Sequence, residues 1–109
     1  MSYSVKSIEV FERQAKKLIR KYPTLKSELS VLIKELKQDP SKGTAIGKKC
    51  YKIRLAIKSK GKGKAGGARI ITHLTVSDEV VFLLSIYDKS DKENLTDTEL
   101  EELLRSIPD

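Results

Sequence analysis

Cysteine, histidine and tryptophan are scarce in this chain, which has one Cys, one His and no Trp in 109 residues. The single cysteine, Cys50, excludes an intrachain disulfide and fits a reducing compartment, so we expect a cytoplasmic protein. One cysteine and one histidine, His73, cannot supply the ligands of a zinc site, and we expect no metal or other cofactor. We interpret Cys50 as a buried thiol and His73 as a bystander.

Long apolar runs are also missing, because no stretch reaches the ~18 residues that a membrane-spanning helix needs. The first residues, MSYSVKSIEVFERQ, are too polar for a signal peptide. A hydrophobic content of 39% is too high for a disordered chain. The length suits a single domain spanning residues 1–109.

Carboxylates are absent from the middle of the chain. Residues 40–77 carry ten Lys or Arg and no Asp or Glu, whereas residues 78–109 carry three basic and ten acidic residues. Such a basic block favours a polyanionic partner, either nucleic acid or a membrane surface. The acidic stretch at residues 97–102 is open to two interpretations: a solvated helix face, or a segment that packs near the basic block and tunes it.

Hydrophobic periodicity predicts an α+β fold with the order β-α-α-β-β-β-α. Residues 3–7 form a weak first strand, and apolar steps of three and four predict an antiparallel helical hairpin over residues 8–22 and 25–38. A period of two beginning at Lys48 starts a three-stranded antiparallel meander, which continues through residues 69–76 and 80–87. The capping-box sequence from Thr96 to Glu99 opens a C-terminal helix. We expect the helices to pack on one face of the sheet.

The stretch KSKGKGKAGGAR, residues 58–69, contains a match to GxGxxG from Gly61 to Gly66. A dinucleotide-binding fingerprint needs a buried strand before it and a helix after it. Here an amphipathic strand precedes the stretch, a strand follows it, and no acid lies about twenty residues on. We therefore predict a long cationic hairpin loop, which either grips a phosphate backbone or serves only for solubility.

Alternation along the strands predicts an open, basic sheet face. If Val80, Phe82, Leu84 and Ile86 belong to the core, Val81, Leu83, Ser85 and Tyr87 point the other way; a β-bulge would flip part of this assignment. The predicted open face gathers Lys52, Arg54, Lys58, Arg69, Tyr87 and Lys89, with His73 further along.

A cationic face with one tyrosine and no carboxylate excludes several chemistries, among them paired-carboxylate hydrolysis and a Ser-His-Asp triad. It suits attack of an RNA 2′-OH on the adjacent phosphate, because Arg and Lys stabilise the charge that develops on the phosphorane. A lysine or tyrosine whose pKa is lowered by neighbouring cations could act as the base. Tyr87 could also stack on an RNA base.

Several local motifs resemble the RelE toxins of bacterial toxin–antitoxin pairs. They are CYKIR at residues 50–54 and the glycine before the arginine-led strand at Gly67-Ala-Arg69. The long loop KGKGKAGGARII and the ending FLLSIYDKSDKENLTDTELEELL most resemble the HigB-type branch of that superfamily. The resemblance covers nearly the whole chain and implies the same α+β, RelE-like fold.

The resemblance implies a ribosome-dependent endoribonuclease that cleaves mRNA in the A site without metal and inhibits translation. It also implies a cognate antitoxin, often a helix-turn-helix protein in the HigB-type branch. Lys52 and Arg54 match the basic pair of the family, and Arg69 matches its phosphate-stabilising arginine. Lys89 stands where RelE has an arginine, and Leu95 stands near the position of its functional tyrosine, a role that Tyr87 could take over.

The predicted site thus has two groups of residues. The catalytic group comprises Lys52, Arg54, Arg69, Tyr87 and Lys89, and the RNA-binding group comprises Lys48, Lys49, Lys58, Lys60, Lys62, Lys64 and Lys92. Two other functions fit the same fold: a ParE-like toxin directed at gyrase, and a non-catalytic module that binds RNA or the ribosome. The Lys52, Arg54 and Arg69 set argues against the ParE-like function, and the departures at Lys89 and Leu95 leave the non-catalytic module open.

Overall fold

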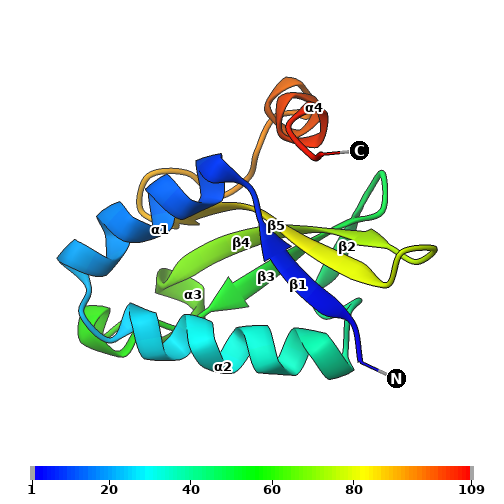
Figure 1. Cartoon of the computed structure of the whole chain (residues 1–109). Helices are drawn as coiled ribbons and strands as arrows, with labels where there is room; N and C mark the ends of the chain where they lie inside the picture. Colours follow the sequence, from blue (N-terminus) through cyan, green and yellow to red (C-terminus); the bar gives the residue numbers. More distant parts are fainter. Residues whose placement is uncertain (1, 109) are drawn as a thin grey trace.

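The computed structural model describes residues 2–108 and confirms the α+β architecture (Figure 1). None of the helices in this range is both long and apolar enough to cross a membrane. The elements are β1 (Ser4–Ser7), α1 (Glu9–Lys21), α2 (Leu25–Gln38), β2 (Thr44–Gly47), β3 (Cys50–Leu55), the short helix α3 (Gly63–Gly66), β4 (Ala68–Thr75), β5 (Val80–Asp88) and α4 (Asp97–Arg105).

The sheet has five strands in the order β1-β5-β4-β3-β2. Strands β3, β4 and β5 form the predicted antiparallel meander, and β1 pairs with β5 in parallel. Strand β2 was not predicted, because its four residues are all exposed and show no alternation of apolar and polar side chains. It pairs with β3 through a tight turn in which Lys48 and Lys49 both have positive φ angles.

Helices cover both faces of the sheet, which corrects the expectation that they pack on one face. Helix α2 runs along one face, α4 crosses the opposite face, and α1 lies beside β5 (Figure 1). The leucine stripe of α2 is fully part of the core, as are Leu100 and Leu103 of α4. Helix α4 has an apolar face that must be buried, and it packs on the face of the sheet that α2 does not cover.

The C-terminal helix begins at the predicted capping box. The backbone N–H of Glu99 donates to Oγ1 of Thr96 at 3.1 Å, and the N–H of Thr96 donates to the Glu99 carboxylate at 2.8 Å. Two otherwise unpaired N–H groups are thereby satisfied, which fixes where the helix starts.

A bulge in β5 changes which side chains share a face. Ile71 pairs with Ser85 but its neighbour Thr72 pairs with Leu83, so Leu84 is the extra residue. Past this point the alternation of β5 is reversed. Phe82 therefore lies opposite His73, on the same face as Ser85. The prediction that Val80 and Phe82 share a face with Ile86 is wrong. The prediction that Val81 and Leu83 share a face with Tyr87 is wrong for the same reason.

Candidate RNA-binding site

Three neighbouring strands place the sequence-predicted catalytic side chains in one row. Arg54 of β3 lies opposite Arg69 of β4, which in turn lies opposite Tyr87 of β5. Lys52, two residues before Arg54, lies on the same face one row further along. The structure thus brings Lys52, Arg54, Arg69 and Tyr87 together on one sheet face, as alternation predicts. The assignment of Lys58 to this face is wrong, because β3 ends at Leu55 and Lys58 lies in the turn beyond it, where its N–H donates to Glu28 of α2.

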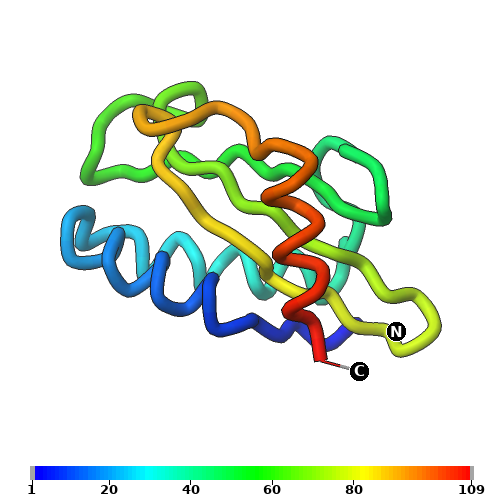
Figure 2. Tube along the Cα trace, turned by 90° about the horizontal axis from the view of Figure 1, so that it is seen from above, coloured from blue at the N-terminus to red at the C-terminus, as the bar shows by residue number. Residues whose placement is uncertain are grey.

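This face is covered, however, and not open. Arg69 is 1% exposed and Tyr87 is 8% exposed, whereas Arg54 and Lys89 are exposed. The chain that follows β5 folds back over the face and continues into α4, which crosses above the sheet (Figure 2). Alternation identifies which residues share a face, but it gives no information about what packs on them.

Within residues 2–108, one ion pair joins the acidic C-terminal segment to the basic block: Glu101 pairs with Lys48 at 2.5 Å. Glu99 pairs with Lys92, which lies outside the block, also at 2.5 Å. These lysines hold the pKa of both carboxyls below the ordinary value. Part of the positive charge of the block is therefore neutralised within the chain. Asp97, Glu101 and Glu102 are exposed, so the segment is a solvated helix face that also contacts the block, and both interpretations apply in part.

The guanidinium of Arg69 donates hydrogen bonds to backbone oxygens of the short helix α3 and of Ala68. Its Nη1 donates to the backbone oxygens of Lys64 at 3.0 Å and Ala68 at 3.3 Å, and its Nη2 donates to that of Ala65 at 3.2 Å. The glycine-rich stretch therefore ends in a ring of carbonyls around the guanidinium. These bonds fix the position of Arg69 but do not neutralise its charge.

The charge of Arg69 is balanced by Glu93, a residue that sequence reasoning missed. An Oε atom of Glu93 lies 3.2 Å from Nη2 of Arg69. Burial by itself raises the pKa of Glu93, but the hydrogen bond and charge of Arg69, with Lys52 and Lys89 nearby, lower it overall. The face predicted to lack carboxylates therefore contains an ionised one. The acidic residues between positions 88 and 93 indicate that a carboxylate follows β5. The sequence does not show that one of them, Glu93, folds back onto Arg69.

The residues next to Glu93 complete the cover. Tyr87 donates its hydroxyl to the backbone oxygen of Glu93 at 3.3 Å, and Lys52 donates to Oδ1 of Asn94 at 2.6 Å. Burial, followed by the charge of Glu93, raises the pKa of Tyr87 to about 12. The expectation that neighbouring cations lower the pKa of this tyrosine is wrong, and Tyr87 keeps its proton at neutral pH.

The predicted RNA-binding lysines divide into three kinds. Lys49, Lys58, Lys62 and Lys64 are exposed and form no ion pair within residues 2–108. Lys48 and Lys92 are the two that pair with α4. The side chain of Lys60 is buried, with 7% exposed, and its ammonium group pairs with Asp88.

The stretch at residues 58–69 is more ordered than a flexible loop. Residues Lys58–Lys60 form a 3-10 turn and Gly63–Gly66 form the helical turn α3. At Gly67 a Cβ atom would lie 2.0 Å from the backbone oxygen of Leu55, so no larger residue fits there. The match to GxGxxG thus belongs to a compact connection whose backbone approaches β3 closely, and not to a nucleotide-binding loop.

Cys50 and His73 lie side by side at the far end of the same face, with Sγ 3.6 Å from Nδ1. Burial raises the pKa of Cys50 to about 11, and it lowers the pKa of His73. Both groups are therefore largely uncharged at neutral pH, and the thiol is a poor nucleophile. Within residues 2–108, no group of three His, Cys, Asp or Glu side chains could hold a metal ion.

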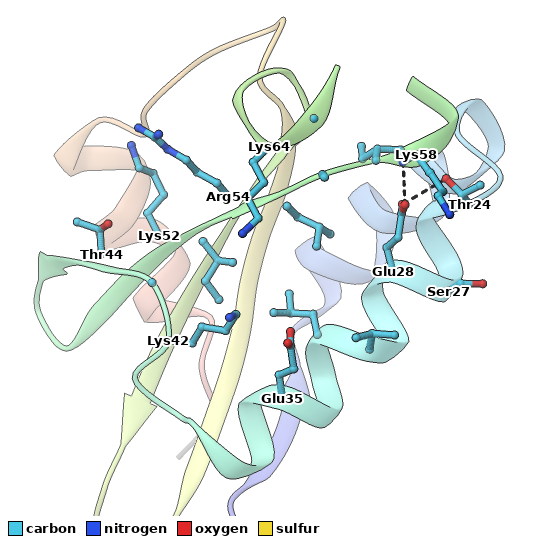
Figure 3. A pocket seen from close by; sticks show the side chains of 18 of the residues that line it. Thr24, Ser27, Glu28, Glu35, Lys42, Thr44, Lys52, Arg54, Lys58 and Lys64 are labelled. Atoms are coloured by element: carbon cyan, nitrogen blue, oxygen red, sulfur yellow. Dashed lines mark hydrogen bonds between the residues drawn. The ribbon is translucent and has the colours of Figure 1, made fainter. Parts of the chain in front are cut away.

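A groove of about 990 Å³ lies on the other side of β3, against α2. Figure 3 shows Glu28, Glu35, Lys42 and Lys64 around this space; Lys52 and Arg54 also belong to its lining, although their side chains extend to the side of β3 away from α2. Leu32 and Ile53 contribute apolar surface. The lining of the groove mixes two carboxylates with lysines, whereas the basic face aligns Arg54, Arg69 and Tyr87 across three strands, so we take that face as the candidate RNA site.

Comparison with known proteins identifies the family and the fold. A family model described as the RelE toxin of the RelE/RelB toxin–antitoxin system matches residues 8–107. A double arginine-to-alanine mutant of E. coli RelE in the free state is 21% identical, covering 99% of this chain and 100% of its own, with a TM-score of 0.61. The isolated E. coli RelE toxin is 20% identical over 97% of this chain and 100% of its own, with a TM-score of 0.62.

At such identities the two structures show a shared fold, whereas the family model matches most of the chain. The two structures agree with the α+β fold, and the family model covers residues 8–107. The chain therefore belongs to the RelE family of toxins of toxin–antitoxin systems.

Proposed function

We propose that this toxin is a ribosome-dependent endoribonuclease that cleaves mRNA in the A site without a metal ion and so inhibits translation. The observation that carries the proposal is the row formed by Arg54, Arg69 and Tyr87, with Lys52 and Lys89 beside it. Five side chains that suit phosphate binding and proton transfer converge there from three strands and the segment after β5. Single-stranded RNA is the polyanion whose own 2′-OH can supply the nucleophile.

In the proposed reaction the 2′-hydroxyl gives up its proton to water, the 2′-oxygen attacks the adjacent phosphorus, and the bond from phosphorus to the 5′-oxygen breaks to leave a 2′,3′-cyclic phosphate. Arg54 and Arg69 stabilise the negative charge that builds up on the non-bridging oxygens. Tyr87 retains its proton, because its pKa is raised to about 12. It therefore suits the role of a proton donor to the leaving 5′-oxygen better than that of a base.

RNA binding outside this row is assigned to the exposed, unpaired lysines Lys49, Lys58, Lys62 and Lys64. Such side chains attract the phosphate backbone without reading sequence. Lys60 is left out of this group because its ammonium group is buried against Asp88. Lys48 and Lys92 would take part only after releasing the carboxylates of α4.

The proposed partners are mRNA and ribosomal RNA in the A site, in the cytoplasm, and a cognate antitoxin. The likeness of the loop and C-terminal sequence to the HigB-type branch favours an antitoxin with a helix-turn-helix domain. Binding of the antitoxin would keep the toxin inactive until it is removed.

The test is induction of the wild-type chain and of Arg54→Ala and Arg69→Ala in bacteria, with primer-extension mapping of mRNA 5′ ends. Loss of one positioned charge-stabilising donor should reduce cleavage by about 100-fold. Lys34→Ala, an exposed change on α2, is the control and should cleave like wild type. Circular dichroism of the purified variants establishes that they are folded, which matters most for the buried Arg69.

Two outcomes would contradict the proposal and favour another function. Growth arrest with DNA damage and intact mRNA would indicate a gyrase-directed toxin of the ParE type. Ribosome binding without new mRNA 5′ ends would indicate a non-catalytic module.

A further inference from the structure

Glu93 and Asn94 contact three of the five side chains assigned to the proposed reaction. The carboxylate of Glu93 pairs with Arg69, its backbone oxygen accepts from Tyr87, and Oδ1 of Asn94 accepts from Lys52. These two residues are therefore positioned as a substrate would be, with oxygen atoms facing the donors of the row.

The contact between Glu93 and Arg69 is poorly fitted. The hydrogen bond from Nη2 of Arg69 to the carboxylate is long, at 3.5 Å, although the other carboxylate oxygen lies 3.2 Å away. Nε of Arg69 and Oε2 of Glu93 are both buried and have no hydrogen-bond partner. A fully buried guanidinium thus keeps one donor unused, and buried donors without partners are rare in folded proteins.

We propose that Arg69, Lys52 and Lys89 form a binding site for one phosphodiester group, and that Glu93 occupies this site in the free protein as an internal stand-in for the ligand. The inference rests on the proposed function for the identity of the ligand as RNA. It adds that substrate must displace Glu93 before Arg69 can contact a phosphate.

The exchange is balanced in charge, because a carboxylate and a phosphodiester each carry one negative charge. Arg69 remains neutralised throughout, and its bonds to the carbonyls of Lys64, Ala65 and Ala68 need not change. Glu93 can leave easily, since 40% of its side chain is exposed and it belongs to the segment between β5 and α4, outside both elements. A phosphodiester offers oxygens in a tetrahedral arrangement, which suits a guanidinium with a free Nε–H.

RNA can bind only to molecules in which Glu93 has left Arg69. The apparent affinity for RNA is therefore the intrinsic affinity multiplied by the fraction of such molecules. Removing the charge of Glu93 should therefore tighten binding, in contrast to removing a residue that holds the ligand. This opposite sign distinguishes an internal competitor from a residue that binds RNA.

The experiment measures binding of a fluorescent oligoribonucleotide, made uncleavable by 2′-O-methyl groups, to the full chain at fixed low salt. Glu93→Gln should bind about fivefold tighter, the scale expected for loss of a partly exposed ion pair. Glu102→Gln is the control, because it removes the same charge from an exposed position of α4 and forms no ion pair within residues 2–108; its affinity should stay within about twofold of wild type.

Glu93→Asp provides a second variant should Glu93→Gln fail to fold. It keeps the charge but is shorter by one methylene, so a gain in affinity would show that the contact with Arg69 is what matters. Equal or weaker binding by whichever of these variants folds would overturn the inference.

The inference and the proposed function can fail separately. Tighter binding by Glu93→Gln without ribosomal mRNA cleavage by any variant would support the phosphodiester site and contradict the endoribonuclease. Cleavage by wild type with unchanged affinity in Glu93→Gln would support the endoribonuclease and contradict the internal competitor.

Discussion

Two ion pairs tie the glycine-rich stretch to the end of β5 and the segment after it, and they differ in how completely they are satisfied. Lys60 pairs with Asp88, and their side chains are 7% and 2% exposed. Asp88 also accepts from the hydroxyl of Tyr22 at 2.8 Å and from the N–H of Ser90 at 2.9 Å. Arg69 pairs with Glu93, whose side chain is 40% exposed, and one polar atom on each side of this pair has no hydrogen bond.

The difference separates a pair that holds the fold from a pair that can be exchanged. A buried ion pair is stable when hydrogen bonds satisfy its remaining polar atoms, as they do around Asp88. The pair of Arg69 with Glu93 lacks this completion, and 40% of the Glu93 side chain is open to solvent. The two pairs lie close in sequence, but one stabilises the fold and the other can be exchanged for a ligand. The following experiments test this difference.

The largest effect is expected from Asp88→Ala. It leaves the ammonium group of Lys60 buried without a counter-charge, and such a loss costs about 3–5 kcal/mol. Urea unfolding should show this decrease, whereas Asp91→Ala, an exposed change three residues on, should have little effect. A decrease for Asp88→Ala no larger than that for Asp91→Ala would show that the pair does not hold the fold.

A smaller effect is expected from acid. Burial by itself raises the pKa of Asp88, but hydrogen bonds from Lys60, Ser90 and Tyr22 hold it well below its ordinary value of 3.8. The unfolded chain therefore binds a proton first, so this stabilisation is complete well above pH 4 and is lost as the pH falls below about 4.

Urea unfolding at pH 7 and pH 3 measures this loss. Asp88→Asn should flatten the acid dependence, because the titrating group is gone. Glu93→Gln should flatten it less, because 40% of the Glu93 side chain is exposed and its ion pair is partly screened by solvent. Equal flattening by the two variants would contradict the distinction between the two pairs.

The smallest effect is expected from the exposed lysines of the same stretch. Lys62→Ala and Lys64→Ala should each reduce the slope of log affinity for RNA against log salt by roughly one, with similar losses for all RNA sequences. Lys34→Ala on α2 is the control. Unchanged slopes for both would remove these lysines from the RNA-binding surface.

The elements that local patterns control could be predicted from the sequence. The leucine stripe of α2, the alternation of β3 and the capping box of α4 each depend on residues within a few positions of one another. Register then follows in part, and Arg54, Arg69 and Tyr87 lie on one face as alternation requires.

Features that depend on distant residues could not be predicted. The bulge at Leu84 leaves no mark in an apolar run, because either neighbour could face the core. Burial of Arg69 depends on Glu93, 24 residues away, and burial of Lys60 depends on Asp88, 28 residues away. The composition of the basic block suggests that all its cations are equivalent, whereas packing makes some structural and leaves others free.

The position of β5 in the sheet has a consequence for the synthesis of this toxin. Residues 80–83 of β5 pair with residues 4–7 of β1, so the first strand finds its neighbour only after most of the chain has been made. Pairing between such distant segments closes slowly, because a long loop must be ordered first. A chain interrupted before Val80 has neither Tyr87 nor the strand that joins β1 to β4, and it cannot assemble the row of side chains. Fragments from aborted synthesis should therefore be harmless to the cell that makes them.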